Sequence, residues 1–252
     1  MMARLRIFIT PFILLLIWQM LVSFKFFSPY LLPSPLTVLQ SFIHLCATGV
    51  LWVYTATSLA RVFCGFFITC LIGVVMAALL HRYQALEELC SVPLSFLRMI
   101  PPLAMTPLLI LWVGIGGATQ ITIIILASFF PIFLNTRDGL KRVTLEQKEL
   151  AQSLNLSGKR YACSILFPAA IPSVITGARL AFGYSWRALI GAELIAASSG
   201  LGYMIIDAQG MQRTDEVIVG ILVIGLIGWV LDGLFYKAVV RLLGRRFPEV
   251  KS

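Results

Sequence analysis

The sequence is poor in charge. Only 12% of its 252 residues are Asp, Glu, Lys or Arg, against about a quarter in an average soluble domain. Because 59% of the residues are apolar and the mean hydropathy is +0.93, too little polar surface remains to cover the chain in water. The same composition excludes intrinsic disorder and a coiled coil. A membrane protein is the class that remains.

Groups that carry redox, metal or nucleophilic chemistry are also scarce. The 5 cysteines are neither dense nor even in number, which excludes a small disulfide scaffold, and their spacing is not that of a metal site. His44 and His81 lie outside the long apolar runs, which excludes a Ser–His dyad within the membrane. The segment Ser157-Gly158-Lys159-Arg160 fails the phosphate-loop pattern at two positions. We expect no catalytic residue, cofactor or metal site, and no ATPase activity in this chain.

The net charge of +9 raises the question of nucleic-acid binding, which requires basic residues gathered on one soluble face. The basic residues instead fall between apolar runs. Their distribution is typical of a signal that sets membrane topology.

Six apolar runs approach the length of about 20 residues that a helix needs to cross a bilayer. The expected fold is all-α, with about six transmembrane helices. We interpret the third and fourth runs, separated by little more than Gly114, as a tight hairpin. The runs are Ile7–Phe24, Val62–Leu80, Leu94–Val113, Ile115–Leu134, Pro172–Ala196 and Val217–Tyr236.

The basic residues outside these runs predict an orientation, because positively charged loops stay in the cytoplasm. With the N-terminus inside, the other side receives only Lys25, Arg61 and Arg213. Both termini are therefore expected in the cytoplasm. The cytoplasmic side receives Arg4, Arg6, Arg82, Arg137, Lys141, Arg142, Lys148, Lys159, Arg160, Lys237, Arg241, Arg245, Arg246 and Lys251.

The first run is expected to stay attached, because it is longer than the apolar part of a signal peptide and Lys25-Phe26-Phe27-Ser28 offers no cleavage site. After it, Ser34 and Pro35 form an N-cap followed by Pro at the first helical position. An external helix on the membrane surface can follow there. A plain connecting helix without substrate contact is the alternative.

The stretch from Asn135 to Ile171 is the longest polar insertion on the cytoplasmic side. Its pattern predicts two short helices around a turn. Asn155 can adopt the left-handed conformation that ends the first helix. The second is expected to run from Ser157 at the N-cap to a stop at Pro168.

This insertion resembles the cytoplasmic EAA loop of membrane subunits of ABC importers of the binding-protein-dependent type I kind. The matching residues are Glu149-Leu150-Ala151, then Asn155, then Ile165-Leu166-Phe167-Pro168. Asn155 stands where the family usually has Gly, which the left-handed turn tolerates, and Phe167 stands where it usually has Leu. The resemblance implies a type I importer transmembrane domain with a cytoplasmic coupling helix.

Further motifs resemble the nitrate, alkanesulfonate and taurine branch of these permeases over residues 30 to 245. The resemblance implies a bacterial inner-membrane location, a homodimer, two copies of a separate ATPase and an external solute-binding protein. It also implies one permease domain over 1–252, with a core region of about 55–240 and the EAA-type loop at about 135–171. The motifs are Leu32-Pro33-Ser34-Pro35, Leu97 to Ala104, Pro107-Leu108, Trp112 to Gly116, Trp186, Ala192 to Ala196, Ser199 to Tyr203 and Thr214-Asp215.

By the resemblance, Glu149, Ala151, Asn155 and Gly158 are expected to couple the permease to its ATPase. A solvated loop without a partner is the alternative. The permease would translocate a small solute, which we expect to be an organosulfonate, taurine or nitrate anion. A vitamin precursor or other small organic solute stays open, as does a stand-alone secondary transporter, and a membrane-embedded enzyme is weaker still.

Charges within the apolar runs are candidates for the translocation pathway, because embedded charges are costly and usually functional. The heptad spacing of Arg179, Trp186 and Glu193 places them near one stripe of a helix, which we expect to face the interior of the dimer. Arg187 lies beside the stripe, and Arg98 precedes the break at Pro101-Pro102. The alternatives are that Arg187 pairs with Glu193, or that Arg98 and Arg179 extend to the cytoplasmic interface. Asp232 is expected to pair with a neighbouring helix or the C-terminal basic cluster.

Overall fold

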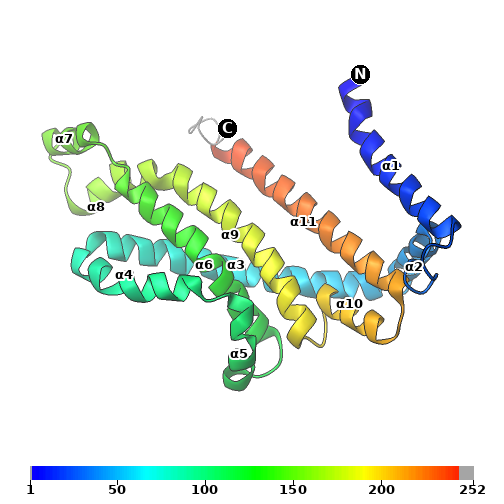
Figure 1. The fold of residues 1–252 in the computed structure, drawn as a ribbon. Coiled ribbons are helices and arrows are strands. Elements are labelled where there is room, and N and C mark those ends of the chain that lie inside the picture. The colour runs from blue at the N-terminus through cyan, green and yellow to red at the C-terminus, as the bar shows by residue number, and fades with distance from the viewer. Residues whose placement is uncertain (1, 244–252) are drawn as a thin grey trace. The chain divides into compact units, whose positions relative to one another are not determined.

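The chain is helical throughout the part that the structure, a computed structural model, describes: the backbone of residues 2–243 and the side chains of residues 9–241. No strand occurs between residues 2 and 243. Figure 1 shows the order of the elements. They are α1 (Met2–Ser23), α2 (Pro35–Ala47), α3 (Val50–Arg82), α4 (Gln84–Met99), η1 (Pro102–Met105), α5 (Thr106–Val113), α6 (Gly117–Lys141), α7 (Leu145–Ser153), α8 (Gly158–Tyr161), η2 (Ala162–Leu166), α9 (Phe167–Ala196), α10 (Leu201–Gly210) and α11 (Thr214–Leu243).

The expected all-α fold is confirmed, and the spans are longer than the apolar runs. Among the described residues, Val50–Arg82, Gly117–Lys141, Gly158–Gly210 and Thr214–Arg241 are long and apolar enough to cross a membrane, and the bent pair α4 and α5 adds a fifth span if counted as one. The remaining run, expected over Ile7–Phe24, lies in α1, whose apolar part in the described side chains, Ile9–Ser23, is shorter.

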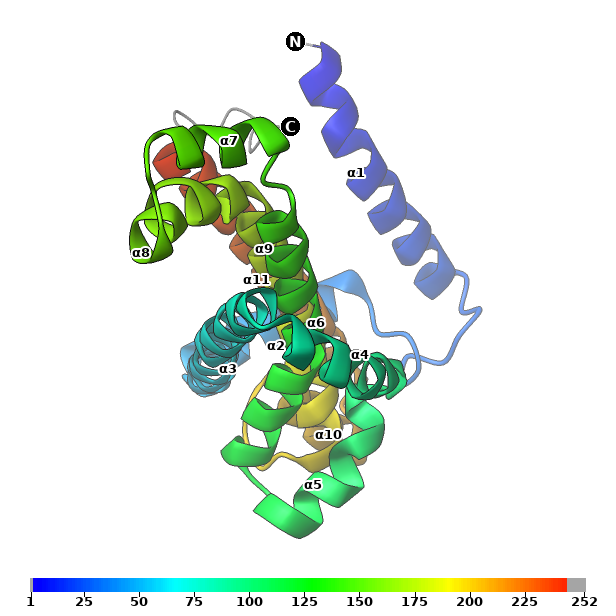
Figure 2. The ribbon, with the colours of Figure 1, turned by 90° about the vertical axis from the view of Figure 1, so that its left-hand side faces the viewer.

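The third expected span, Leu94–Val113, is not one straight helix. Two segments, Gln84–Met99 and Pro102–Val113, meet at 88°, and Figure 2 shows α4 and α5 running in different directions. Pro101 and Pro102 lack the N–H that a continuing helix needs, so the expected break at this dipeptide is confirmed. The tight turn at Gly114 is confirmed as well, since Gly114 and Gly116 have φ of 88° and 146°.

The chain forms two compact units. One contains residues 1–58 and 198–227, and the other contains residues 59–197 and 228–252.

In the first unit, a side-chain cap and long-range hydrogen bonds fix the helix ends and the loops between them. The Ser34 side chain caps α2 by accepting from the Thr37 N–H at 3.1 Å, as expected. The Trp18 indole donates to the Pro33 carbonyl at 3.0 Å, and the Ser41 hydroxyl donates to the Asp215 carboxylate. These bonds satisfy polar groups between apolar elements.

In the second unit, α6 and α9 form the densest helix pair (Figures 1 and 2). Gly139 and Gly177 permit the close approach: a Cβ at either would lie 2.7 Å from the Cβ of Ser173 or Asn135 across the pair. Small residues bring helix backbones together in membrane proteins. The glycines of α11 differ in how closely they are packed. Of these, Gly220 and Gly228 are closely packed, whereas a Cβ at Gly225 would meet nothing within 4 Å.

The orientation stays a prediction. Arg245, Arg246 and Lys251 lie outside the described residues, as do the side chains of Arg4 and Arg6. Arg61 belongs to α3, a helix of 33 residues, and its place on the outer side also stays a prediction.

Candidate functional site

The polar insertion contains a short, well-capped helix, α7. Thr144 and Gln147 form a reciprocal capping box at its start. At its end, the Leu156 N–H donates to the Ala151 carbonyl at 2.8 Å and the Asn155 N–H to the Gln152 carbonyl at 3.0 Å. These two bonds define a Schellman motif, and Asn155 has the left-handed φ of 52°. The predicted turn at Asn155 is confirmed.

The second helix of the insertion does not stop at Pro168, so that prediction was wrong. It begins at Gly158, with Ser157 at the N-cap as expected, but passes through the π-helical segment η2 directly into α9. Pro168 lies in the first turn of α9. Proline is tolerated there because the local π geometry rearranges the backbone bonds that its missing N–H interrupts.

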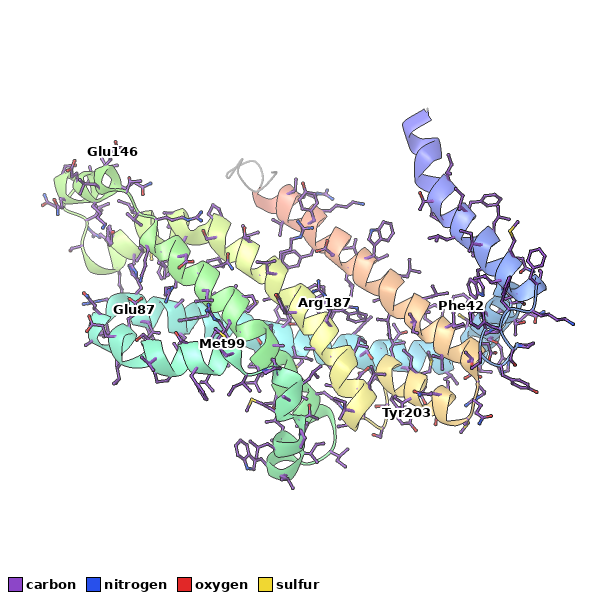
Figure 3. The ribbon with its side chains drawn as sticks, viewed as in Figure 1. Phe42, Glu87, Met99, Glu146, Arg187 and Tyr203 are labelled. Carbon is purple, nitrogen blue, oxygen red and sulfur yellow. The ribbon has the colours of Figure 1, made fainter. Side chains whose placement is uncertain are left out.

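The four residues expected to contact an ATPase differ in exposure. Glu149, Asn155 and Gly158 are exposed, whereas Ala151 is only 2% exposed. Leu150 of α7 and Leu154 at the C-cap of that helix, four residues apart, are both exposed. Figure 3 labels Glu146 on this same helix. The insertion therefore presents an apolar surface on a rigid, capped helix.

Glu193 forms a buried ion pair, and its partner was not the expected one. Arg61 of α3 donates through Nη1 to Oε1 of Glu193 at 2.8 Å. The Glu193 side chain is 0% exposed and that of Arg61 is 13% exposed. The alternative that Arg187 pairs with Glu193 is therefore wrong.

Arg179 pairs with Asp232 across α9 and α11. Its Nε and Nη2 donate to the two carboxylate oxygens at 3.1 Å and 2.9 Å, and its guanidinium lies 5.1 Å from the centre of the Tyr236 ring. Both side chains of the pair are about half exposed. The expectation that Asp232 pairs with a neighbouring helix is confirmed.

The three residues of the heptad stripe on α9 differ in exposure. Trp186 is 7% exposed, and a Cβ at Gly228 of α11 would lie 2.7 Å from its Nε1. Since Glu193 is buried against Arg61, only Arg179 of the three keeps a substantial exposed surface. Helices of the same chain thus cover Trp186 and Glu193, and the place of the three residues on the translocation pathway stays a prediction.

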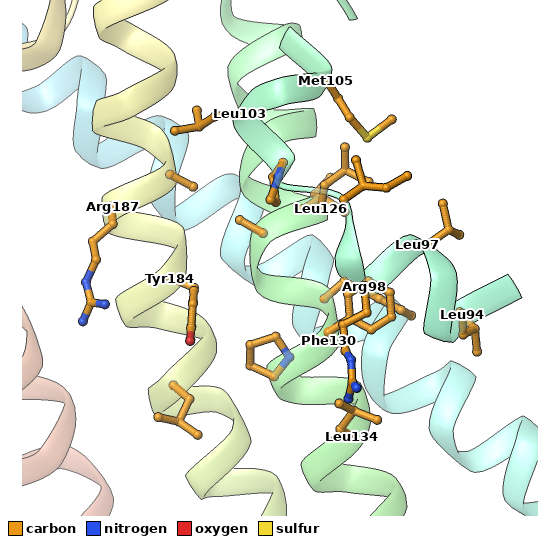
Figure 4. A pocket seen from close by; sticks show the side chains of 18 of the residues that line it. Leu94, Leu97, Arg98, Leu103, Met105, Leu126, Phe130, Leu134, Tyr184 and Arg187 are labelled. Carbon is orange, nitrogen blue, oxygen red and sulfur yellow. The ribbon is translucent and has the colours of Figure 1, made fainter. Parts of the chain in front are cut away.

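Arg98 and Arg187 line a cavity of about 950 Å³. Its walls are otherwise mainly apolar side chains of α4, α6 and α9, including Leu97, Phe130 and Leu180. In Figure 4, Arg98 and Arg187 lie on opposite sides of Tyr184. Among the described residues neither forms an ion pair, and the Arg187 guanidinium lies 5.8 Å from the Tyr184 ring centre. The cavity thus offers guanidinium groups within an apolar wall.

Sequence reasoning missed Tyr184 and the partner role of Arg61. Arg61 carried a signal, since it directly precedes the apolar run Val62–Leu80 and lies in the same helix, which begins at Val50. Tyr184 carried none, because an aromatic residue in an apolar run is ordinary. No group of three or more His, Cys, Asp or Glu side chains that could hold a metal occurs among the residues described.

Comparisons with known proteins identify transport permeases as relatives of this chain. A family model described as the binding-protein-dependent transport system inner membrane component matches residues 70–248. The chain is 33% identical to an aliphatic sulfonates transport permease protein of Bacillus subtilis, over 96% of this chain and 86% of that protein. It is 32% identical to the taurine transport system permease protein of Escherichia coli, over 95% and 88%. It is 31% identical to the nitrate import permease protein of Synechocystis, over 87% and 82%.

The fold is similar to that of a solved amino acid ABC transporter with histidines. The TM-score is 0.64 at 18% identity, over 81% of this chain and 97% of the other.

Proposed function

We propose a solute and partners for this chain on the premise that it belongs to the family of binding-protein-dependent transport system inner membrane components. Its relatives over most of its length are permeases, and several apolar helices are long enough to cross a membrane. The chain is thus a multi-pass inner membrane permease of the ABC importer type for a small solute. The solute, the energy source and the partners are the parts that we propose.

The solute is an organosulfonate, taurine or nitrate anion. The cavity carries this proposal: its mainly apolar wall contains Arg98 and Arg187, neither of which has an ion-pair partner among the described residues. Guanidinium groups bind oxyanions through directed N–H donors, and embedded charges are functional candidates by default. The apolar wall suits a solute with a short hydrocarbon part, and the named solutes of three relatives are anions or, for taurine, carry an anionic sulfonate.

ATP is hydrolysed by two copies of a partner ATPase, which dock on the insertion around α7. The exposed Leu150 and Leu154 supply the apolar contact, while the Schellman motif at Asn155 and the capping box hold the helix rigid enough to transmit motion. Glu149, Ala151, Asn155 and Gly158 are its coupling residues. A second copy of this chain completes the permease, an external binding protein delivers the solute, and both termini lie in the cytoplasm.

The docking proposal is tested by changing the exposed surface without changing the helix. We expect Leu150→Gln to leave the permease in the membrane but to reduce co-purification of the ATPase and uptake by tenfold or more. Lys148→Gln is the matched control, because Lys148 is exposed on another side of the same helix. Ala151→Asp should also uncouple transport, but for a different reason: Ala151 is buried, so the substitution places a charge where water cannot reach it. Normal ATP-dependent uptake by Leu150→Gln and Ala151→Asp would contradict the proposal.

The solute is tested by growth of a strain that lacks the permease on single sulfur or nitrogen sources: alkanesulfonates, taurine, nitrate and sulfate. We expect growth to fail on one of the first three and to return with the intact gene but not with Leu150→Gln. Growth on every source would contradict an anionic solute and would direct the search to vitamin precursors or other small organic solutes. That result would leave the permease assignment unchanged.

A further inference from the structure

A row of three residues on α9 places two arginines on either side of a gap. Arg179, Gly183 and Arg187 follow one another at intervals of four residues, so they lie along one ridge of the helix. The two arginine Cα atoms are about 12 Å apart along the axis, from the helical rise of 1.5 Å per residue. Gly183 contributes no side chain between them.

The Arg187 side chain bends back over this gap. A Cβ built on Gly183 would lie 3.8 Å from Nη2 of Arg187 and would meet nothing else within 4 Å. Long helical side chains lean toward the N-terminus, which here is toward Arg179. The gap is therefore bordered by the Arg187 guanidinium at one end and by the backbone position of Arg179 at the other, while the Arg179 guanidinium itself lies against Asp232 and Tyr236.

The two guanidinium groups differ in how their charge is balanced. Arg187 is exposed and forms no ion pair among the described residues, and its guanidinium lies 5.8 Å from the centre of the Tyr184 ring. Arg179 makes a two-point ion pair with Asp232, but the two side chains remain 46% and 52% exposed. Asp232 thus neutralises Arg179 from one side only.

Exposure of this pair at its depth in the fold requires an explanation. Arg179 lies about 18 Å into α9 from Phe167, and Asp232 about 17 Å from the end of α11 at Leu243, from the helical rise. Both lie within helices that could span the bilayer. A charge that faces lipid deep in the bilayer is costly, so we expect this surface to face water or protein.

We propose that Arg179, Gly183 and Arg187 form an anion-binding subsite on the translocation pathway, with Asp232 as a counter-ion that the solute displaces from Arg179. This inference rests on the proposed transport of an anion. The sulfonate or nitrate oxygens enter the gap over Gly183 and accept N–H groups from Arg187. The Arg179 side chain then turns from Asp232 toward the gap to donate to the same anion, and the anion leaves when the Asp232 carboxylate pairs with Arg179 again. No covalent bond forms or breaks.

The counter-ion role makes a prediction that a purely structural ion pair does not make. In Asp232→Asn the competing carboxylate is gone while the shape is kept. We expect the KM for uptake of the transported anion to fall by up to about fivefold, the factor that corresponds to an exposed pair of up to about 1 kcal/mol. We expect the maximal rate to fall as well, because release of the anion is no longer assisted. If KM rises in Asp232→Asn as it does in Arg179→Gln, the displacement mechanism is wrong.

The gap itself is tested with a bulky residue. Gly183→Leu fills the gap with only ordinary contact at its Cβ, and Gly233→Leu is the matched control, because a Cβ at Gly233 of α11 would meet nothing within 4 Å. We expect Gly183→Leu and Arg187→Gln to lose tenfold or more in uptake, with normal membrane levels of the permease and unchanged co-purification of the ATPase. Equal uptake by Gly183→Leu and Gly233→Leu would overturn the subsite.

A binding measurement separates this inference from the proposed solute. Ethanesulfonate and nitrate are titrated into the full-length permease in lipid nanodiscs, for the wild type and both glycine variants. Loss of anion binding in Gly183→Leu but not in Gly233→Leu supports an anion site at the gap, whereas an uncharged solute in the growth panel overturns both the proposed solute and the place of this site on its pathway. Transport of an anion combined with unchanged binding in Gly183→Leu overturns the subsite and leaves the proposed function standing.

Discussion

Replacing Arg61 by methionine should destabilise the chain more than any other single loss of a guanidinium. Its Nη1 lies 2.8 Å from Oε1 of Glu193, whose side chain is 0% exposed. The variant therefore leaves a carboxylate in a site without access to water. Loss of one partner of a buried pair costs about 3–5 kcal/mol. At roughly 2–4 °C per kcal/mol for a chain of this size, the expected drop in melting temperature is about 6–20 °C.

The matched comparison is Arg179→Met. Arg179 and Asp232 have equally good geometry but are about half exposed, and such pairs contribute about 0–1 kcal/mol. We therefore expect a shift of no more than about 4 °C from this variant. Burial, rather than the number of hydrogen bonds, makes the difference between the two pairs.

Thermal unfolding of the detergent-solubilised permease, followed by size-exclusion chromatography after heating, measures both shifts. The double variant Arg61→Met with Glu193→Met should recover most of the lost stability, because apolar side chains of similar volume often replace a buried pair at little cost. Equal shifts for Arg61→Met and Arg179→Met would refute the reasoning, and so would a double variant no more stable than Arg61→Met alone.

Two further substitutions test local geometry. Asn155→Val places a β-branched residue at a φ of 52° and should cost about 1–2 kcal/mol, seen as faster proteolysis of the insertion, whereas Asn155→Gly should behave as the wild type. Gly177→Leu should abolish the monodisperse chromatographic peak, because its Cβ would lie 2.7 Å from that of Asn135 and 3.1 Å from the Pro131 carbonyl oxygen. Gly225→Leu, in open space, should not change that peak, and a normal peak for Gly177→Leu would contradict the packing argument.

The features that sequence reasoning predicted correctly depend on short stretches of chain. An apolar run of sufficient length forms a helix wherever it lies, because the backbone must satisfy its own hydrogen bonds. The turn at Asn155 depends on one residue's tolerance of left-handed geometry and on the carbonyls within four residues of it. The break at Pro101-Pro102 likewise follows from the missing N–H groups.

The features that it missed depend on what lies across the fold. Proline usually marks a helix boundary, but before Pro168 the π-helical segment η2 carries the helix onward. The proline pair permits a break between α4 and α5, but it does not by itself determine the angle of 88°. Gly139 and Gly177 became recognisable as a packing surface only once α6 and α9 were known to be neighbours.

The embedded charges show why a pattern on one helix does not identify a transport pathway. Heptad spacing placed Arg179, Trp186 and Glu193 together, yet α3 covers Glu193 and α11 covers Trp186. A charge that its own chain buries and neutralises has a structural explanation already. Arg187, which the stripe excluded, is exposed without an ion-pair partner among the described residues. It is therefore the better candidate for contact with a solute, because an anion would supply the neutralising charge that the described part of the chain does not.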